Sequence, residues 1–299
     1  MVFFNVVVPV FIVFAAGYVV QKLFHLDLKP ISTTVIYILS PFLAFHTFYD
    51  ADLNMDALYL IVFALLLTVT LLALIYLYSR IRHFSTGDFC GLVLTTVFMN
   101  GGNYGVPVAL FAFGEPGLHA AVIIMVIQSL TMSTVGIYFA AKGGEETKGV
   151  SPWKRVLTIP IAYGAILGAL CNVIGLHLPD ALARPVSLIS DATIPMVMIL
   201  LGMQLANITL KKIPMEKVSV AIFGRLLISP LLSLLIVWML PVSGVVEKVM
   251  ILIAAMPTAA NTTIYALQFN TRPTLVTTST LLSTVLSIVT IPVLITFLL

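Results

Sequence analysis

The chain has 299 residues, of which 60% are hydrophobic and only 9% are charged, and its net charge is +3. Soluble domains carry about 25% charged residues, so this composition excludes a soluble fold and indicates that lipid is the natural solvent. A helix needs about 20 mostly apolar residues to cross the hydrocarbon core of a bilayer, which leaves room for about ten such helices and short connections.

Apolar stretches separated by short polar connections recur along the whole sequence. No Lys or Arg precedes the first stretch, which favours a membrane span over a secretory signal peptide. The predicted spans are 2–21, 31–49, 56–79, 89–112, 118–141, 157–176, 186–206, 218–240, 248–269 and 275–298.

Basic residues lie mainly in the connections that follow odd-numbered spans. Of the 15 Lys and Arg residues, 12 lie in those connections, whereas only Arg184 and Lys248 follow even-numbered spans. The remaining one, Arg225, lies inside the eighth span. Cytoplasmic loops carry an excess of Lys and Arg. We therefore predict a multi-pass protein of the cell membrane with both termini outside.

The longest connection divides the chain into two halves of five spans. We predict an N-terminal five-helix repeat at 1–141, a cytoplasmic loop at 142–156 and a C-terminal five-helix repeat at 157–299. Because five is odd, the second half enters the membrane upside down relative to the first, as in transporters built from inverted repeats. Pro41 in the middle of span 2 has a counterpart, Pro195, in span 7.

The fourth span carries the strongest functional signal, the segment Asn100–Pro107. It contains Gly101, Gly102, Gly105 and Pro107 within seven residues. Each interior glycine destabilises a helix by about 1 kcal/mol and a proline by about 3 kcal/mol, so a continuous helix is not expected. Backbone groups freed by a break cannot face lipid and must line a cavity or be buried in protein.

The ninth span has a matching break in the segment 256–263, which is shaped by Pro257 and centred on Asn261. Broken helices at corresponding positions of two repeats are the best sequence indication of a binding site at the bilayer midplane. A broken helix exposes one N-terminal and one C-terminal end, so the charge of the solute stays open. The candidate substrate-binding residues are Asn100, Asn103, Tyr104, Asn261, Thr262 and Tyr265.

Both broken segments are similar to those of a known family. Asn100, Gly105 and Pro107 in span 4, and Pro257 with the stretch 265–273 in span 9, closely resemble the auxin efflux carrier family, as does the ten-span count. The resemblance covers the whole chain, and the family is similar in fold to bile-acid/sodium symporters. The plant members differ in carrying a long loop and a lysine at the position of Leu267, so the chain resembles the short-loop prokaryotic members.

This resemblance implies an architecture and a class of substrate. Spans 1, 2, 6 and 7 would form a scaffold, whereas spans 3–5 and 8–10 would form a mobile unit that holds the substrate where spans 4 and 9 cross. The unit would move like an elevator. The implied substrate is a small carboxylate such as malate or malonate, and a homodimer is implied as well.

Three ionisable residues inside the predicted spans are candidates for coupling. Asp191 lies near the outer end of span 7 and His46 near the outer end of span 2, so a proton-binding pair is one hypothesis. Arg225 lies two turns from the cytoplasmic end of span 8, where snorkelling to the headgroups is expected ahead of substrate pairing.

The sequence leaves three functions open. The first is an all-helical secondary carrier of a small organic anion. The second is a cation/proton antiporter on the same scaffold, which is weakened because neither break holds an acidic residue. The third is a membrane receptor that does not transport. No enzyme, metal or nucleotide motif occurs, so we expect no catalysis and no cofactor, and we expect lipid and a small anion rather than nucleic acid as partners.

Overall fold

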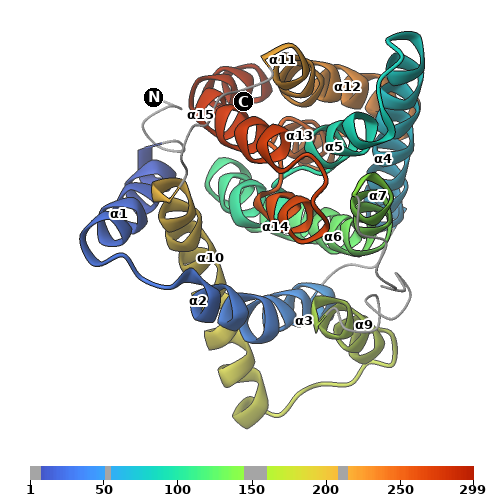
Figure 1. Cartoon of the computed structure of the whole chain (residues 1–299). Coiled ribbons are helices and arrows are strands. Elements are labelled where there is room, and N and C mark those ends of the chain that lie inside the picture. Colours follow the sequence, from blue (N-terminus) through green and yellow to red (C-terminus); the bar gives the residue numbers. More distant parts are fainter. Residues whose placement is uncertain (1–7, 51–54, 145–159, 208–214) are drawn as a thin grey trace.

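The computed structural model describes residues 8–50, 55–144, 160–207 and 215–299, and these ranges are helical without any strand (Figure 1). The predicted loop 142–156 lies almost wholly outside the described residues, as do five of the basic residues used to predict orientation: Lys148, Lys154, Arg155, Lys211 and Lys212.

Six helical segments of the described ranges are long and apolar enough to cross a bilayer. They are Leu28–Asp50, Met55–Ile81, Gly101–Gly143, Asp180–Ala206, Met215–Met239 and Pro273–Leu298. Val8–Phe24 and Pro160–Val173 are shorter apolar helices. Large apolar side chains such as Trp238 and Phe297, each more than four-fifths exposed, cover the outside, as expected for a surface that faces lipid. The chain is therefore a multi-pass membrane protein, whereas ten crossings stay a prediction.

One group of helices combines the beginning of the chain with its middle (Figure 1). Within it, α1 packs along α10, and α3 packs along α9 and α10. Its members are α1 (Val8–Phe24), α2 (Leu28–Thr34), η2 (Val35–Leu39), α3 (Ser40–Asp50), α9 (Pro160–Val173) and α10 (Asp180–Ala206). These are the helices that the predicted scaffold contains.

Glycines let the helices of this first group approach backbone to backbone. A Cβ added to Gly202 of α10 would lie 1.9 Å from the carbonyl oxygen of Phe14 in α1. A Cβ added to Gly164 of α9 would lie 2.1 Å from the carbonyl oxygen of Pro41 in α3. Small residues permit such close contacts between membrane helices, so the two pairs are held by backbone packing.

The second group contains the remaining helices and most of the buried apolar core. Figure 1 shows it beside the first group. Its members are α4 (Met55–Ile81), α5 (Thr86–Thr96), η3 (Gly101–Gly105), α6 (Val106–Thr131), η4 (Met132–Gly136), α7 (Ile137–Gly143), α11 (Met215–Phe223), η5 (Gly224–Ile228), α12 (Ser229–Met239), α13 (Gly244–Ala254), α14 (Ala260–Phe269) and α15 (Pro273–Leu298). These are the helices of the predicted mobile unit.

Two sharp turns in this second group separate the fourth predicted span from the fifth and the ninth from the tenth. Gly114, with φ of +68°, interrupts α6 two residues before Pro116. Asn270 and Arg272, both with positive φ, join α14 to α15. Because these conformations end a helix, the chain reverses at both places, close to the span boundaries expected from the sequence.

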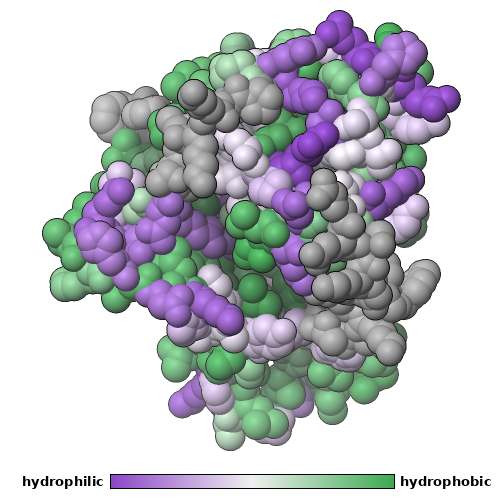
Figure 2. Space-filling view, in the orientation of Figure 1, coloured by the Kyte–Doolittle hydropathy of each residue, from purple (hydrophilic) through white to green (hydrophobic). Residues whose placement is uncertain are grey.

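Polar side chains cluster at one end of the second group. Asp88 at the start of α5 bonds Lys217 of α11 at 2.6 Å and Arg272 at 2.7 Å. Figure 2 shows hydrophilic side chains gathered over this end, above a recess between the two groups that contains hydrophobic side chains. The predicted cytoplasmic connections meet at this end.

Candidate functional site

Two interrupted helices meet in the middle of the second group. Helix α5 ends at Thr96 and helix α13 ends at Ala254, and the extended residues that follow form an antiparallel bridge between Met99 and Thr258. The N–H of Asn100 donates to the carbonyl of Pro257 at 2.7 Å. Both predicted interruptions are therefore present, and they lie against each other.

The unwound segments begin a few residues before the positions expected from the sequence. The expected centres, Asn103 and Asn261, lie instead in the first turns of η3 and α14. Gly105 also belongs to η3, and a Cβ there would lie 2.6 Å from Cδ1 of Ile253. The glycine thus serves close packing against α13 rather than the break itself, and Pro107 is buried in the first turn of α6.

Hydroxyl groups satisfy backbone atoms that the crossing leaves without helical partners. Thr258 donates from Oγ1 to the carbonyl of Thr95 at 2.7 Å, and its N–H donates to Oγ of Ser283 at 3.2 Å. All three residues are fully buried. An unpaired backbone group in the membrane interior costs several kcal/mol, so these hydroxyls stabilise the interruption.

A cavity of about 270 Å³ lies between the crossing and the first group of helices. Its polar walls come from both groups and carry no charged side chain among the described residues. The polar lining residues are Ser32, Tyr37, Ser40, Asn100, Asn103, Gln128, Ser129, Ser133, Gln204, Asn261 and Tyr265.

The N-terminal ends of two helices face this cavity. Asn100–Asn103 begins η3 and α6, and Ala259–Asn261 begins α14, and both segments line the cavity. Neither helix has a side-chain cap. The first N–H groups of a helix lack intrahelical partners, and each N-terminus carries about half a positive elementary charge. The walls therefore present hydrogen-bond donors and a positive potential.

Two amide side chains add donors to the same cavity. Nδ2 of Asn100 and Nε2 of Gln128 are buried and have no hydrogen-bond partner in the part of the chain that the structure describes. Both residues are at least nine-tenths buried. A buried donor without a partner costs about 1–3 kcal/mol, so an acceptor-rich ligand would relieve this cost.

Four of the six predicted substrate-binding residues line the cavity, namely Asn100, Asn103, Asn261 and Tyr265. Tyr104 does not, because its buried ring packs edge-on against Phe14 and its hydroxyl lies 3.3 Å from Oγ of Ser287. Thr262 does not either, because it is fully buried and donates to the carbonyl of Ala259. Both side chains are therefore packing residues of the protein interior rather than cavity-lining residues.

Arg225 does not snorkel to the headgroups, contrary to the sequence-based expectation. It lies in the π-turn η5 with its side chain fully buried. Its guanidinium donates to the carbonyl of Thr96 at 2.8 Å, and also to the carbonyl of Ala254 and the hydroxyl of Ser229. The two carbonyl acceptors, of Thr96 and Ala254, come from other helices, so hydropathy could not place this side chain.

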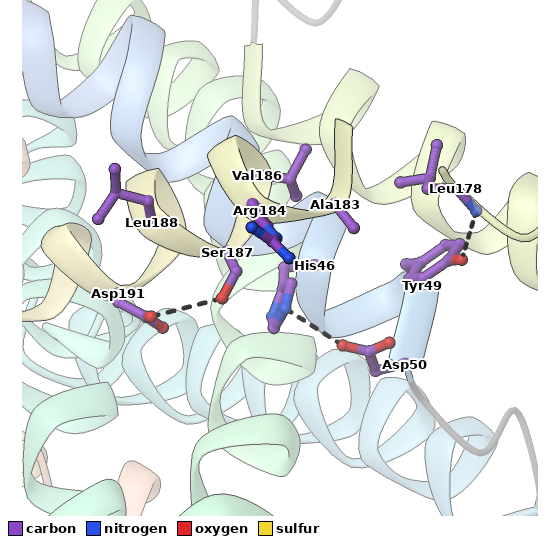
Figure 3. A pocket seen from close by; sticks show the side chains of 10 residues that line it. All are labelled: His46, Tyr49, Asp50, Leu178, Ala183, Arg184, Val186, Ser187, Leu188 and Asp191. Atoms are coloured by element: carbon purple, nitrogen blue, oxygen red, sulfur yellow. Dashed lines mark hydrogen bonds and ion pairs between the residues drawn. The ribbon is translucent and has the colours of Figure 1, made fainter. Parts of the chain in front are cut away.

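The predicted pair of His46 and Asp191 does not form a direct contact. Nε2 of His46 lies 3.3 Å from the carboxylate of Asp50, whereas Asp191 accepts a hydrogen bond from Ser187 at 3.4 Å (Figure 3). Both residues nevertheless line one cavity of about 470 Å³, beside Arg184. A second cavity adds Glu115 and His119 to His46 and Asp191. These groups are separate from the cavity at the crossing.

Sequence reasoning missed polar residues that the first group contributes to the crossing cavity. Gln204 near the end of α10 lines it, as do Ser32 and Ser40. An amide in an apolar helix was a signal for Gln204, but only the packing of α10 against η3 brings it to the site.

A helical membrane protein with two interrupted helices crossing beside a polar cavity has the architecture of a transporter. Comparison with known proteins agrees: residues 2–295 match the family described as membrane transport protein. The chain belongs to this family, which is the auxin efflux carrier-like family indicated by the sequence.

Three relatives illustrate the family. An "Uncharacterized transporter" of Methanothermobacter thermautotrophicus is 31% identical over 292 residues, covering 96% of this chain and 95% of the relative. An "Uncharacterized transporter" of Methanocaldococcus jannaschii is 26% identical, with 96% of each chain covered. A Rhizobium meliloti protein named "Putative malonate transporter" is 25% identical over 203 residues, covering 64% of this chain and 62% of the relative.

Proposed function

We propose that the protein carries a small organic anion across the membrane and binds it in the cavity beside the crossing. The observation that carries this proposal is the convergence of two uncapped helix N-termini and two unpaired amide donors on one cavity. Helix N-termini bind carboxylate and phosphate groups. The name of the Rhizobium relative supports a carboxylate such as malonate.

The size and lining of the cavity favour a small solute. Pockets for drug-sized ligands are about 300–1,000 Å³, and this cavity is smaller, at about 270 Å³. A cation/proton antiporter would need an acidic ligand, and no Asp or Glu lines the cavity among the described residues. The lining therefore favours an anion carrier over the antiporter.

We further propose alternating access by an elevator movement. The first group, α1–α3 with α9 and α10, would stay fixed while the second group carries the cavity across. The cavity is lined by Pro160 at the start of α9 and Gln204 near the end of α10, which are residues next to connections predicted to be cytoplasmic. The described conformation would then be the inward-facing one. Ten spans in two inverted repeats, both termini outside and a homodimer belong to the same proposal.

Purified protein in proteoliposomes provides the test. We expect saturable uptake of at least one radiolabelled carboxylate from a panel that includes malonate, malate and indole-3-acetate, with sodium and pH gradients varied independently. Empty liposomes are the control. Binding of these acids without uptake would favour a receptor, and uptake of a cation without any effect of the acids would favour the antiporter.

A further inference from the structure

A buried cation, Arg225, lies at the crossing but does not line the cavity. Arg225 is 0% exposed, and its guanidinium donates to carbonyl groups at the C-terminal ends of α5 and α13, the helices that precede the two interruptions. Thr96 is the last residue of α5 and Ala254 is the last residue of α13. One side chain therefore contacts the C-terminal ends of two helices that are 158 residues apart in sequence.

The charge of Arg225 compensates the partial charges of the helix C-termini at this crossing. Each helix C-terminus carries about half a negative elementary charge, and each N-terminus about half a positive one. The positive charge of Arg225 cancels the two C-terminal ends, while the N-terminal ends of η3 and α14 stay uncompensated at the cavity. No carboxylate is paired with Arg225 within the described residues.

We propose that Arg225 sets the preference of the cavity for anions without touching the solute. Met99 separates the two, because it lines the cavity while its Sδ lies 3.9 Å from the guanidinium of Arg225. This inference rests on the proposed function, since it concerns the same cavity. Arg225 is thus a positioning and charge-setting residue rather than a binding residue.

Variants at Arg225 separate charge from shape. A unit charge about 10 Å from an anion, at an effective permittivity of about 20, changes affinity roughly ten- to twentyfold. We expect Arg225→Gln and Arg225→Met to raise the KM for the carboxylate that the wild type takes up fastest by roughly that factor. Arg225→Lys retains the charge, so we expect it to keep most of the wild-type affinity for the carboxylate. Its single ammonium group cannot contact both helix ends in the same way.

Ser229 offers a second pair of variants that leaves Arg225 in place. Its hydroxyl contacts the guanidinium and also donates to the carbonyl of Ala254 at 2.8 Å. Ser229→Asp would pair with Arg225 and cancel its charge, whereas Ser229→Asn has similar size and no charge. We expect the KM to rise with Asp and to stay near the wild-type value with Asn.

The outcomes are distinguishable. If the Gln, Met and Asp variants fold and transport with wild-type KM, the inference is wrong and Arg225 only holds the helices together. If the Arg225 variants do not fold, the two Ser229 variants decide the question. If Ser229→Asn folds and Ser229→Asp does not, that result also counts against the inference. A wild-type protein that takes up no carboxylate overturns both this inference and the proposed function.

Discussion

The N–H of Asn100 and the carbonyl oxygen of Pro257 are joined by a hydrogen bond of 2.7 Å, and this bond connects the two interrupted helices. The N–H of Ala259 donates to the carbonyl of Phe98 at 2.9 Å on the other side of the bridge. Since these backbone groups pair with each other, neither interruption is satisfied without its partner. The two interruptions therefore form together.

Thr258 tests how strongly the hydroxyl network stabilises this crossing. Thr258→Val removes the group that donates to the carbonyl of Thr95 at 2.7 Å and keeps the shape of the side chain. Because it leaves a buried acceptor unpaired, we expect a loss of about 1–3 kcal/mol in the free energy of unfolding. Thermal unfolding in detergent measures this, with Thr258→Ser as the control that retains the hydroxyl. Equal melting temperatures for wild type and Thr258→Val would show that the network contributes nothing.

Gly202 tests the backbone packing of the first group. Gly202→Ala would place a methyl group 1.9 Å from the carbonyl oxygen of Phe14, so α1 and α10 must move apart. Overpacking of this kind costs about 1–3 kcal/mol or more, and we expect a lower melting temperature and less monodisperse protein. Gly101→Ala is the control for stability, because its methyl group would meet only Cγ2 of Ile253 at 3.7 Å. An unchanged melting temperature for Gly202→Ala would contradict the described packing.

The general location of the interruptions could be predicted from the sequence, but their exact position could not. Gly101, Gly102 and Pro107 indicated a break because they disfavour a continuous helix. The unwound residues lie just before them, where pairing of Met99 with Thr258 replaces helical hydrogen bonds. That pairing joins residues 159 positions apart in sequence, so local propensity contains no information about it.

Buried polar residues show the same limit of sequence reasoning. Hydropathy shows that Arg225 lies within an apolar stretch but cannot distinguish a helix face towards lipid from one towards other helices. Only the assembled helices bring the carbonyls of Thr96 and Ala254 to this side chain. Asp50 was missed as the partner of His46 although it lies four residues away on the same helix, a spacing at which helical side chains meet.

Asp88 predicts a dependence of stability on pH. Burial raises its pKa, but hydrogen bonds from Lys217 and Ser85 and the charge of Arg272 outweigh burial, so the pKa lies below the ordinary 3.8. A carboxyl whose pKa is lowered on folding stabilises the protein above its unfolded pKa and loses this effect as the pH falls through its folded pKa. The stabilisation is therefore present at neutral pH and is lost below about pH 3.8.

Asp88→Asn tests this dependence directly. We expect it to lower the free energy of unfolding at pH 7 by about 1–3 kcal/mol, because it weakens two charged hydrogen bonds. The difference in melting temperature from the wild type should narrow as the pH falls below 4. Glu216→Gln is the control, since the ion pair of Glu216 with Arg82 is exposed on both sides and such pairs contribute little. A difference that stays constant with pH would contradict the assignment.

Substitutions of Asn103 and Asn261 test separately the two helix N-termini that face the cavity. Both line it from the first turns of η3 and α14. We expect Asn103→Ala and Asn261→Ala to abolish carboxylate uptake while the protein stays folded, because each removes donors beside a helix N-terminus. Uptake into proteoliposomes and size-exclusion chromatography provide the two measurements. Wild-type rates in both variants would remove these residues from the mechanism.

Replacing Gln128 by leucine is expected to change stability and transport in opposite directions. Its buried Nε2 has no partner among the described residues, so Gln128→Leu relieves an unpaired donor and is expected to raise the free energy of unfolding by about 1 kcal/mol. The same change removes a donor from the cavity, and we expect carboxylate uptake to fall at least tenfold, a loss of about 1.4 kcal/mol in binding.

Gln21→Leu is the matched amide control for this prediction. Nε2 of Gln21 donates to the carbonyl of Leu26 and to the side chain of Asn207, both at 3.1 Å, and Gln21 does not line the cavity. Oε1 of Gln21 is buried without a partner among the described residues, but Gln21→Leu also leaves the two acceptors of Nε2 unpaired, and this loss outweighs the relief. We therefore expect Gln21→Leu to lower stability and to leave the KM for the carboxylate unchanged, which is the reverse of the Gln128→Leu result. If Gln128→Leu instead lowers stability and retains uptake, this amide holds the helices together, and the ligand contact assigned to it is wrong.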